Sequence, residues 1–511
     1  MSKFYRLLLL SVLYSVVWKS TTAQEIPKIN HPFFTDLNVA LKNKEKVYRL
    51  NLSNQGLDHL PANIQKLKKL EELNIGNNRF KKFPKVLLKM KQIKILRLYN
   101  NKIAQLPTGI DSLKQLEQLD VQRNLLTELP KKIGRLRSLT SLNIANNKIK
   151  ALPEELGKLK KLESFKAFDN QLQKLPESIS NLRKLVHVAL RNNKLSKIPW
   201  GKYKQLKILD LSRNQLTSLP SDIKNLKKLK ELYLQQNKLG KLPNEIGELQ
   251  LLQRLYLNEN KIKRLPKSFI KLTNLELVKL EHNELLEVPF EIGNLQKLKI
   301  FSLHHNNIRN LPESLGKLNK LVTLQLSNNQ LENLPNNIGN MTSLKAIWVR
   351  KNNLQTLPKS ISKLKKIERI YASYNQISVL PAELAKLTKL KSLSFNKNQL
   401  MELPDEFWGF KELYFLDLSQ NRLKKIPTKI SEMKSLRILV LSSNRLKRLP
   451  YGITHLTNLR ELYLDYNQLT KLPPNMGALL KLKIFTIKHN TFSREEKALI
   501  RKQLSHVRIG F

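Results

Sequence analysis

Two histidines and a glutamate occupy the same position in three successive stretches of the chain. Glu259, His282 and His305 are 23 residues apart, and each directly precedes an asparagine. Imidazole nitrogens and a carboxylate are ligands for Zn²⁺ and related ions, so a fold that stacks these stretches side by side would offer a metal site. Such neighbours also hydrogen-bond to one another and to water, which is the simpler interpretation. We therefore expect no catalytic residue, cofactor or metal, and we keep these three residues only as a weaker alternative.

A second group consists of aromatic and arginine side chains at, or beside, the positions that alternate with leucine. Tyrosine and tryptophan flanked by arginine are typical of the energetic centres of protein interfaces. The alternative is cross-strand stacking that only stiffens a sheet. We favour a partner-binding surface, because Trp348 on a polar sheet would have no core to fill. The candidate residues, all expected to face solvent, are Tyr233, Tyr256, Trp348, Arg350, Arg369, Tyr371, Tyr374, Phe415, Tyr463 and Tyr466.

A repeated unit, LxxLxLxxN, must position both groups. Its LxL part alternates and predicts a short strand with the leucines turned inward. The segment after the asparagine reads LxxLP, with isoleucine and leucine following at helical spacing, and predicts a short helical turn that begins at the proline. The asparagine recurs every 23 residues, with a single step of 21 between Asn193 and Asn214.

The asparagines themselves are expected to be structural. A buried asparagine at the bend after each strand can donate and accept hydrogen bonds with the backbone of its own turn and the adjacent one. Stacked repeats would align these side chains as a ladder. Its members are Asn78, Asn101, Asn124, Asn147, Asn170, Asn193, Asn214, Asn237, Asn260, Asn283, Asn306, Asn329, Asn352, Asn375, Asn398, Asn421, Asn444, Asn467 and Asn490.

The repeat array, predicted over 47–492, requires covers at its two ends. Residues 24–46 are expected to form a lead-in and an N-terminal cap, with a short helix that is capped at Thr35 and Asp36. Residues 493–511 are expected to form a C-terminal helix and strand, with Ser493 and Glu496 as a capping box. In the 21-residue repeat, we expect Tyr203 to take the place of a core leucine.

The first residues predict an export signal. Lys3 and Arg6 precede an apolar run over 7–17, and small residues follow up to Ala23. This pattern is typical of a cleaved secretory signal peptide, here 1–23, and the run is shorter than the ~20 residues that span a membrane. We expect no integral membrane span after cleavage and a secreted, periplasmic or cell-surface location. The chain contains no cysteine, which favours a bacterial source for an exported protein.

The formal net charge is +52, and removal of the three cations in 1–23 leaves +49. The positions that flank the LxL leucines carry both signs, so most of the excess lies in the arms between strands. Examples are Lys158, Lys160, Lys161, Lys363, Lys365 and Lys366. Such lysines keep a long array soluble. The alternative is attraction to a polyanion such as lipopolysaccharide or an acidic polysaccharide. Specific nucleic-acid binding is not expected, because no base-stacking motif accompanies the lysines.

Over about 47–492 the chain resembles leucine-rich-repeat proteins of the 23-residue class, LxxLxLxxNxLxxLPxxIxxL, which includes the Ras-suppressor and Scribble-like repeats. The resemblance implies an α/β solenoid: a horseshoe of about twenty repeats, with a parallel sheet on the concave face and short helical or 3-10 turns on the convex face. It also implies a non-enzymatic scaffold whose concave sheet binds macromolecules, usually proteins. The predicted signal peptide differs from the intracellular members and suggests an exported bacterial one, so their partners are not transferred.

Overall fold

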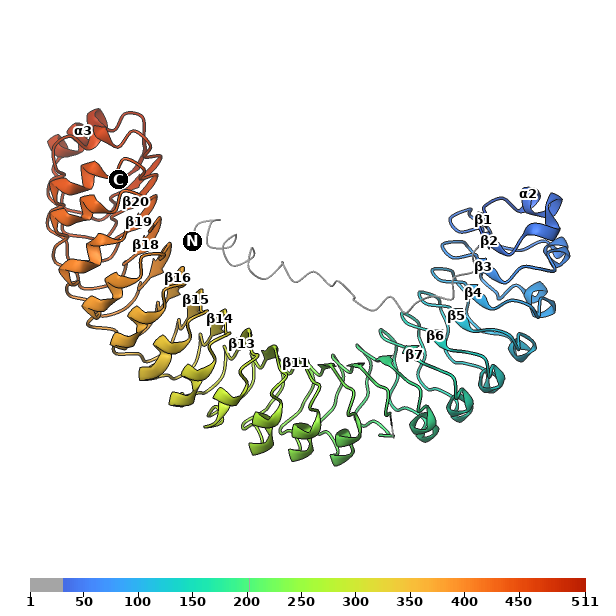
Figure 1. Cartoon of the computed structure of the whole chain (residues 1–511). Helices are drawn as coiled ribbons and strands as arrows, with labels where there is room; N and C mark the ends of the chain where they lie inside the picture. The colour runs from blue at the N-terminus through green and yellow to red at the C-terminus, as the bar shows by residue number, and fades with distance from the viewer. Residues whose placement is uncertain (1–30, 202) are drawn as a thin grey trace.

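The computed structural model describes residues 31–201 and 203–511. The predicted signal peptide lies outside these residues. The described chain forms an open arc in which the strands line the inner side and short helices follow the outer side (Figure 1). This is the horseshoe solenoid that the repeat predicts.

One parallel sheet of 22 strands runs through the described residues. Each strand pairs with the next strand in the chain, so that Leu232 lies beside Leu255 in register. The strands are β1 (Phe33–Phe34), β2 (Arg49–Asn51), β3 (Glu72–Asn74), β4 (Ile95–Arg97), β5 (Gln118–Asp120), β6 (Ser141–Asn143), β7 (Ser164–Lys166), β8 (His187–Ala189), β9 (Ile208–Asp210), β10 (Glu231–Tyr233), β11 (Arg254–Tyr256), β12 (Leu277–Lys279), β13 (Ile300–Ser302), β14 (Thr323–Gln325), β15 (Ala346–Trp348), β16 (Arg369–Tyr371), β17 (Ser392–Ser394), β18 (Phe415–Asp417), β19 (Ile438–Val440), β20 (Glu461–Tyr463), β21 (Ile484–Thr486) and β22 (Arg508–Gly510).

Short 3-10 helices form the outer side of the arc. They are η1 (Lys44–Lys46), η2 (Ala62–Lys66), η3 (Lys85–Lys89), η4 (Ile110–Ser112), η5 (Lys131–Arg135), η6 (Glu154–Lys158), η7 (Glu177–Asn181), η8 (Ser221–Asn225), η9 (Asn244–Glu248), η10 (Lys267–Lys271), η11 (Ile292–Asn294), η12 (Glu313–Lys317), η13 (Asn336–Asn340), η14 (Lys359–Lys363), η15 (Ala382–Lys386), η16 (Asp405–Gly409), η17 (Thr428–Glu432), η18 (Tyr451–His455) and η19 (Met476–Ala478).

The repeat proline lies one residue earlier than the sequence predicted. In η6, for example, Pro153 is the residue before the helix, with φ −72°, and its carbonyl accepts from the amide of Leu156. Proline suits this capping position, because its φ is fixed near the required value and its missing N–H is not needed there. The third helical residue, here Leu156, is fully buried and joins the core that runs along the arc.

The ladder asparagines tie each repeat to the one before it. Asn283 Oδ1 accepts from the amide of Ile262 at 3.0 Å, and its Nδ2 donates to the carbonyls of Leu257 and Leu280 at 3.0 Å. The same three bonds recur from Asn78 to Asn490. These are the bonds to own and adjacent turns that the sequence predicted, and they satisfy backbone groups that the three-residue strands leave unpaired.

The 21-residue repeat shortens the outer arm. No helix is found between β8 and β9 in the residues that the structure describes there. Tyr203 is 7% exposed and packs in the core, and its hydroxyl donates to the carbonyl of Pro199 at 3.1 Å. The prediction that Tyr203 replaces a core leucine is confirmed.

The two ends of the sheet are covered by helices. Asp36 caps α2 (Leu37–Lys42), as predicted, and β1 adds an extra strand before β2 that the sequence did not reveal. Ser493 caps α3 (Arg494–Gln503) by accepting from the amide of Glu496. The Glu496 carboxylate accepts from the amide of Leu472, so it ties α3 to the last repeats. None of the helices in the described range is long and apolar enough to cross a membrane.

Candidate binding face

The inner side of the arc presents the side chains that flank each buried strand centre. In β10, for instance, Leu232 is buried, whereas Glu231 and Tyr233 are half-buried at the surface. The parallel register brings equivalent side chains of adjacent repeats together in lanes. The concave face is therefore a long, continuous surface whose chemistry is set by the variable positions of the repeat.

A further lane follows the strand ends. The residue before each of the nineteen ladder asparagines has a positive φ, as does Asn54, which precedes Gln55 at the equivalent position of the first repeat; the values run from 63° at Asn54 to 54° at His489. None of these residues is β-branched, which fits the high cost of the left-handed region for such side chains. From Asn54 to Tyr466, each amide in the lane donates to a carbonyl of the next repeat, as Asn77 N does to Tyr99 O. We call these positions the left-handed lane.

Six residues from three neighbouring repeats form one aromatic and cationic group, which we call the Trp348 patch. Trp348 and Tyr371 stack with ring centroids 6.0 Å apart. Tyr374, from the left-handed lane, lies beside both of its lane neighbours, with Lys397 Nζ 4.6 Å and Lys351 Nζ 5.9 Å from its ring centroid. The Arg350 guanidinium carbon is 5.9 Å from the same ring. The patch consists of Trp348, Arg350, Lys351, Tyr371, Tyr374 and Lys397.

Neighbouring polar groups hold the patch in place. The Tyr371 hydroxyl is 3.1 Å from Ser392 Oγ on the next strand, and burial raises the pKa of this tyrosine. Arg369, predicted to contact the partner, lies beside the patch, and its guanidinium is 3.9 Å from the Glu368 carboxylate. Lys391 approaches the same carboxylate at 3.7 Å.

Sequence reasoning missed Lys351 and Lys397. It considered the position before the ladder asparagine as a lane only for Glu259, His282 and His305, and it included Tyr374 for its aromatic character. The available signal was the residue type before the ladder asparagine, where β-branched residues are absent throughout. The absence of β-branched residues indicates a backbone position with positive φ, and the side chains at this position form a lane beside the strands.

A second aromatic pair, Tyr233 and Tyr256, stacks with centroids 4.6 Å apart. The Tyr233 hydroxyl and the neighbouring Arg254 both have an acidic partner within the chain. Glu231 Oε2 accepts from the Tyr233 hydroxyl at 2.5 Å, and its Oε1 accepts from Arg254 Nη1 at 2.6 Å. Desolvation and the Glu231 hydrogen bond raise the pKa of Tyr233 above its usual range.

The remaining predicted contacts are dispersed. Tyr463 donates to Glu461 at 2.7 Å, and Tyr466 is 57% exposed and stacks on His489 at 4.2 Å. The expectation that Phe415 faces solvent is wrong, because this ring is only 8% exposed. Its strand neighbour Ile438 is as deeply buried and lies beside it in register, so the lane at this point is apolar and closely packed.

The histidine group forms a stack. His282 and His305 lie face to face with centroids 4.1 Å apart, and His304 meets both edge-on. Burial, with the nearby His305 and His282, lowers the pKa of His304 to about 4. Within the described parts of the chain, no three or more His, Cys, Asp or Glu side chains are grouped so as to hold a metal ion. Glu259 instead accepts from Gln236 Nε2 at 2.9 Å.

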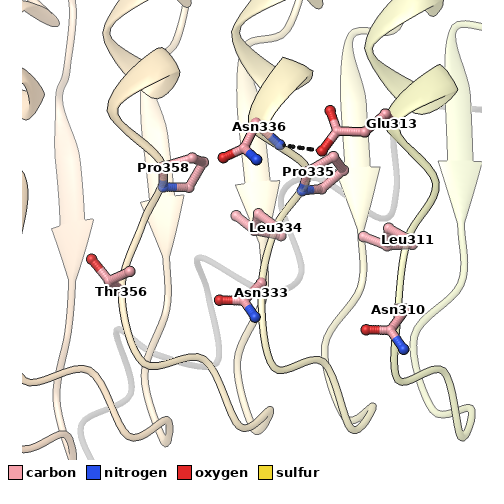
Figure 2. A pocket seen from close by; sticks show the side chains of 9 residues that line it. All are labelled: Asn310, Leu311, Glu313, Asn333, Leu334, Pro335, Asn336, Thr356 and Pro358. Carbon is pink, nitrogen blue, oxygen red and sulfur yellow. Dashed lines mark hydrogen bonds between the residues drawn. The ribbon is translucent and has the colours of Figure 1, made fainter.

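A shallow depression lies on the flank between the sheet and the outer helices (Figure 2). Its lining residues are Asn310, Leu311, Glu313, Asn333, Leu334, Pro335, Asn336, Thr356 and Pro358. The one carboxylate among them, Glu313, accepts from the amides of Asn336 and Asn337 and so caps η13 of the next repeat. The depression is therefore explained by packing between repeats.

The chain is thus a parallel-strand solenoid with a continuous concave surface, and sequence comparison supports this class. Profiles described as "Leucine rich repeat" match residues 68–126, 114–172, 373–423, 412–469 and 434–492. A profile described as "Leucine-rich repeat region" matches 191–286 and 276–353. No curated protein sequence matches the chain.

Solved structures provide the second comparison. A leucine-rich-repeat protein from Leptospira interrogans is 30% identical and is matched over 94% of this chain and 100% of its own, with a TM-score of 0.55. A TDR receptor is 25% identical, with coverage of 93% and 95% and a TM-score of 0.69. The Arabidopsis receptor kinase HAESA ectodomain, in complex with an IDA peptide hormone ligand, is 26% identical, with coverage of 88% and 79% and a TM-score of 0.66. The chain belongs to the leucine-rich-repeat family.

Proposed function

We propose that this chain is an exported, non-enzymatic scaffold that binds a protein or peptide partner on its concave sheet, with the contact centred on the Trp348 patch. The observation that carries the proposal is the half-exposed Trp348–Tyr371 stack, which lies among cationic side chains on the concave sheet. Stacked rings lose little conformational freedom on binding and present a large apolar area. Such groups dominate the binding energy of protein interfaces.

The relatives support a binding role in general terms. The HAESA ectodomain structure contains a bound peptide hormone, and a plant receptor named RGFR1 is also solved in complex with a peptide, RGF2. We extend peptide or protein binding to this chain as part of the proposal. Its inner face, like any twenty-repeat sheet at about 4.8 Å per strand, is on the order of 100 Å long, which suits a macromolecular ligand.

The proposal includes the organisation and location of the chain. We assign 1–23 to a signal peptide, 24–46 to a lead-in and cap, 47–492 to repeats of the 23-residue LP class, and 493–511 to a C-terminal cap. We place the mature protein outside the cytoplasm of a bacterium, in the periplasm, at the cell surface or secreted. The support is the n-region, apolar run and small residues at the start of the sequence.

Affinity capture from the envelope and its surroundings tests the binding proposal. The mature chain is immobilised as wild type and as the Trp348→Ala, Arg350→Glu, Tyr371→Ala triple variant. We expect the wild type to retain a partner that the triple variant loses. A variant with Lys158→Glu and Lys161→Glu on the outer side is the matched control and should retain it. Equal capture by wild type and triple variant would contradict the site.

The exposed lysines of the outer side support a second candidate, the binding of a polyanion such as lipopolysaccharide or an acidic polysaccharide. Lys158, Lys161, Lys363 and Lys366 are all exposed. This candidate predicts retention on heparin that falls steeply with salt and persists when Trp348 is removed. If retention is lost with Trp348, the outer side is not the polyanion site.

A further inference from the structure

The cations of the Trp348 patch lack an acidic partner. Arg350, Lys351 and Lys397 form no ion pair with any carboxylate among the described residues, and the nearby Glu368 is shared by Arg369 and Lys391. Arg350 Nε is withdrawn from solvent and has no hydrogen-bond partner within the described structure. An incoming carboxylate could therefore form charge-assisted hydrogen bonds with these cations without displacing an internal acidic partner.

The Tyr233–Tyr256 stack provides an internal comparison. There, Glu231 accepts from both the Tyr233 hydroxyl and Arg254, so the chain supplies the anion itself. The Trp348 patch has a similar stacked pair and more cations, but no acid occupies the corresponding place. This difference between two aromatic groups on one sheet indicates that the missing anion is external.

The surroundings limit the size of that anion. Acidic side chains occur on the concave face on both sides of the patch: Glu281 and Glu259 towards the N-terminal end, and Glu461 and Asp465 towards the C-terminal end. A long, uniformly charged polymer lying along the sheet would meet these carboxylates and be repelled. A short acidic segment confined to the patch would not.

We infer, resting on the proposed partner-binding function, that the Trp348 patch binds a short acidic segment of a protein partner. Carboxylates of this segment contact Arg350, Lys351 and Lys397, and an adjacent apolar or aromatic side chain lies on the Trp348–Tyr371 stack. The patch spans strands β15 to β17, roughly 10 Å at the usual strand spacing, which corresponds to three or four residues of extended peptide.

A phage-displayed library of random dodecapeptides, panned on the mature chain, identifies the preferred sequence. We expect the enriched peptides to contain clustered Asp or Glu next to an apolar residue. The most enriched peptide is then synthesised with a fluorescent label, together with a copy in which every Asp and Glu becomes Asn and Gln. We expect the amide copy to bind roughly ten-fold or more weakly by fluorescence anisotropy.

Charge-removing variants locate the contact. Lys351→Gln with Lys397→Gln changes two exposed side chains, so the fold is expected to persist, and the acidic peptide should bind roughly ten-fold more weakly. Lys158→Gln with Lys161→Gln removes the same charge from the outer side and should change the Kd less than about two-fold. Equal weakening by both pairs would overturn the inference, because it would show only a long-range effect of net charge.

Other outcomes separate this inference from the proposed function. Enriched peptides that are neutral or basic, yet lose binding on Trp348→Ala, would overturn the acidic specificity and leave the concave binding site standing. No enriched peptide, together with heparin binding that is lost on Trp348→Ala, would overturn both. Acidic peptides whose binding is unaffected by Trp348→Ala and by the Lys351 and Lys397 changes would overturn the location.

Discussion

Trp348 and Tyr371 face each other in register on adjacent strands, with their ring planes inclined by 28°. The Tyr371 hydroxyl is anchored at Ser392 on the third strand. The pair is therefore fixed by three consecutive repeats before any partner arrives. Because the two rings are already held in place, less side-chain conformational entropy is lost when a partner binds. The cations around this pair have no acidic partner among the described residues, whereas Glu231 pairs with Tyr233 and Arg254 at the Tyr233–Tyr256 stack.

Each ladder asparagine should contribute substantially to the stability of the repeats that it joins. Asn283→Ala would leave the buried backbone groups of Ile262, Leu257 and Leu280 without their partner. We expect a loss of about 2 to 4 kcal/mol in local stability. Hydrogen exchange at the Ile262 amide measures this directly. Asn333→Ala, which changes an exposed asparagine, is the control. Similar exchange in both variants would contradict the role given to the ladder.

The sequence predicted the scaffold well because each scaffold position has one physical requirement. The ladder asparagines need both donors and an acceptor, and Ser493 and Asp36 need a short acceptor at a helix start. The sequence predicted the binding face less well. Phe415 occupies a surface lane by alternation, but its exposure depends on Ile438 in the next repeat. Lys351 and Lys397 join Tyr374 only through the left-handed backbone before the asparagine, which alternation does not reveal.

Close packing between neighbouring outer helices should make a glycine such as Gly157 difficult to replace. A Cβ added at Gly157 would lie 2.3 Å from the Ser178 carbonyl oxygen, which is backbone and cannot move aside cheaply. We expect Gly157→Ala to destabilise the array by about 1 to 3 kcal/mol. Gly240→Ala is the matched control, because a Cβ there meets nothing within 4 Å. The midpoints of urea unfolding should separate the two variants, and equal midpoints would show that the outer helices relax freely.

The histidine stack predicts acid sensitivity. The pKa of His304 is lowered to about 4 in the folded chain by burial and by the neighbouring His305 and His282. The unfolded chain, with its ordinary value near 6.5, binds a proton that the folded chain does not, so stability falls as pH drops from about 6.5 to 4. At pH 5 the loss should be about 1 to 2 kcal/mol.

His304→Gln should remove this part of the pH dependence. Thermal unfolding at pH 7 and pH 5 measures it, and the wild type should lose more of its Tm between the two values than the variant does. The variant retains His282 and His305, so the difference between the two proteins isolates the contribution of His304. An identical loss in both proteins would mean that His304 titrates in the folded chain as it does in the unfolded one.

The central claim is that a partner binds the concave sheet at the Trp348 patch. Hydrogen-deuterium exchange of the mature chain, with and without the captured partner, tests it most directly. We predict that the partner slows exchange in β15 to β17 and in the left-handed lane at Lys351, Tyr374 and Lys397, with no change in the outer helices η13 to η15. Protection confined to those outer helices, with β15 to β17 unchanged, would contradict the account.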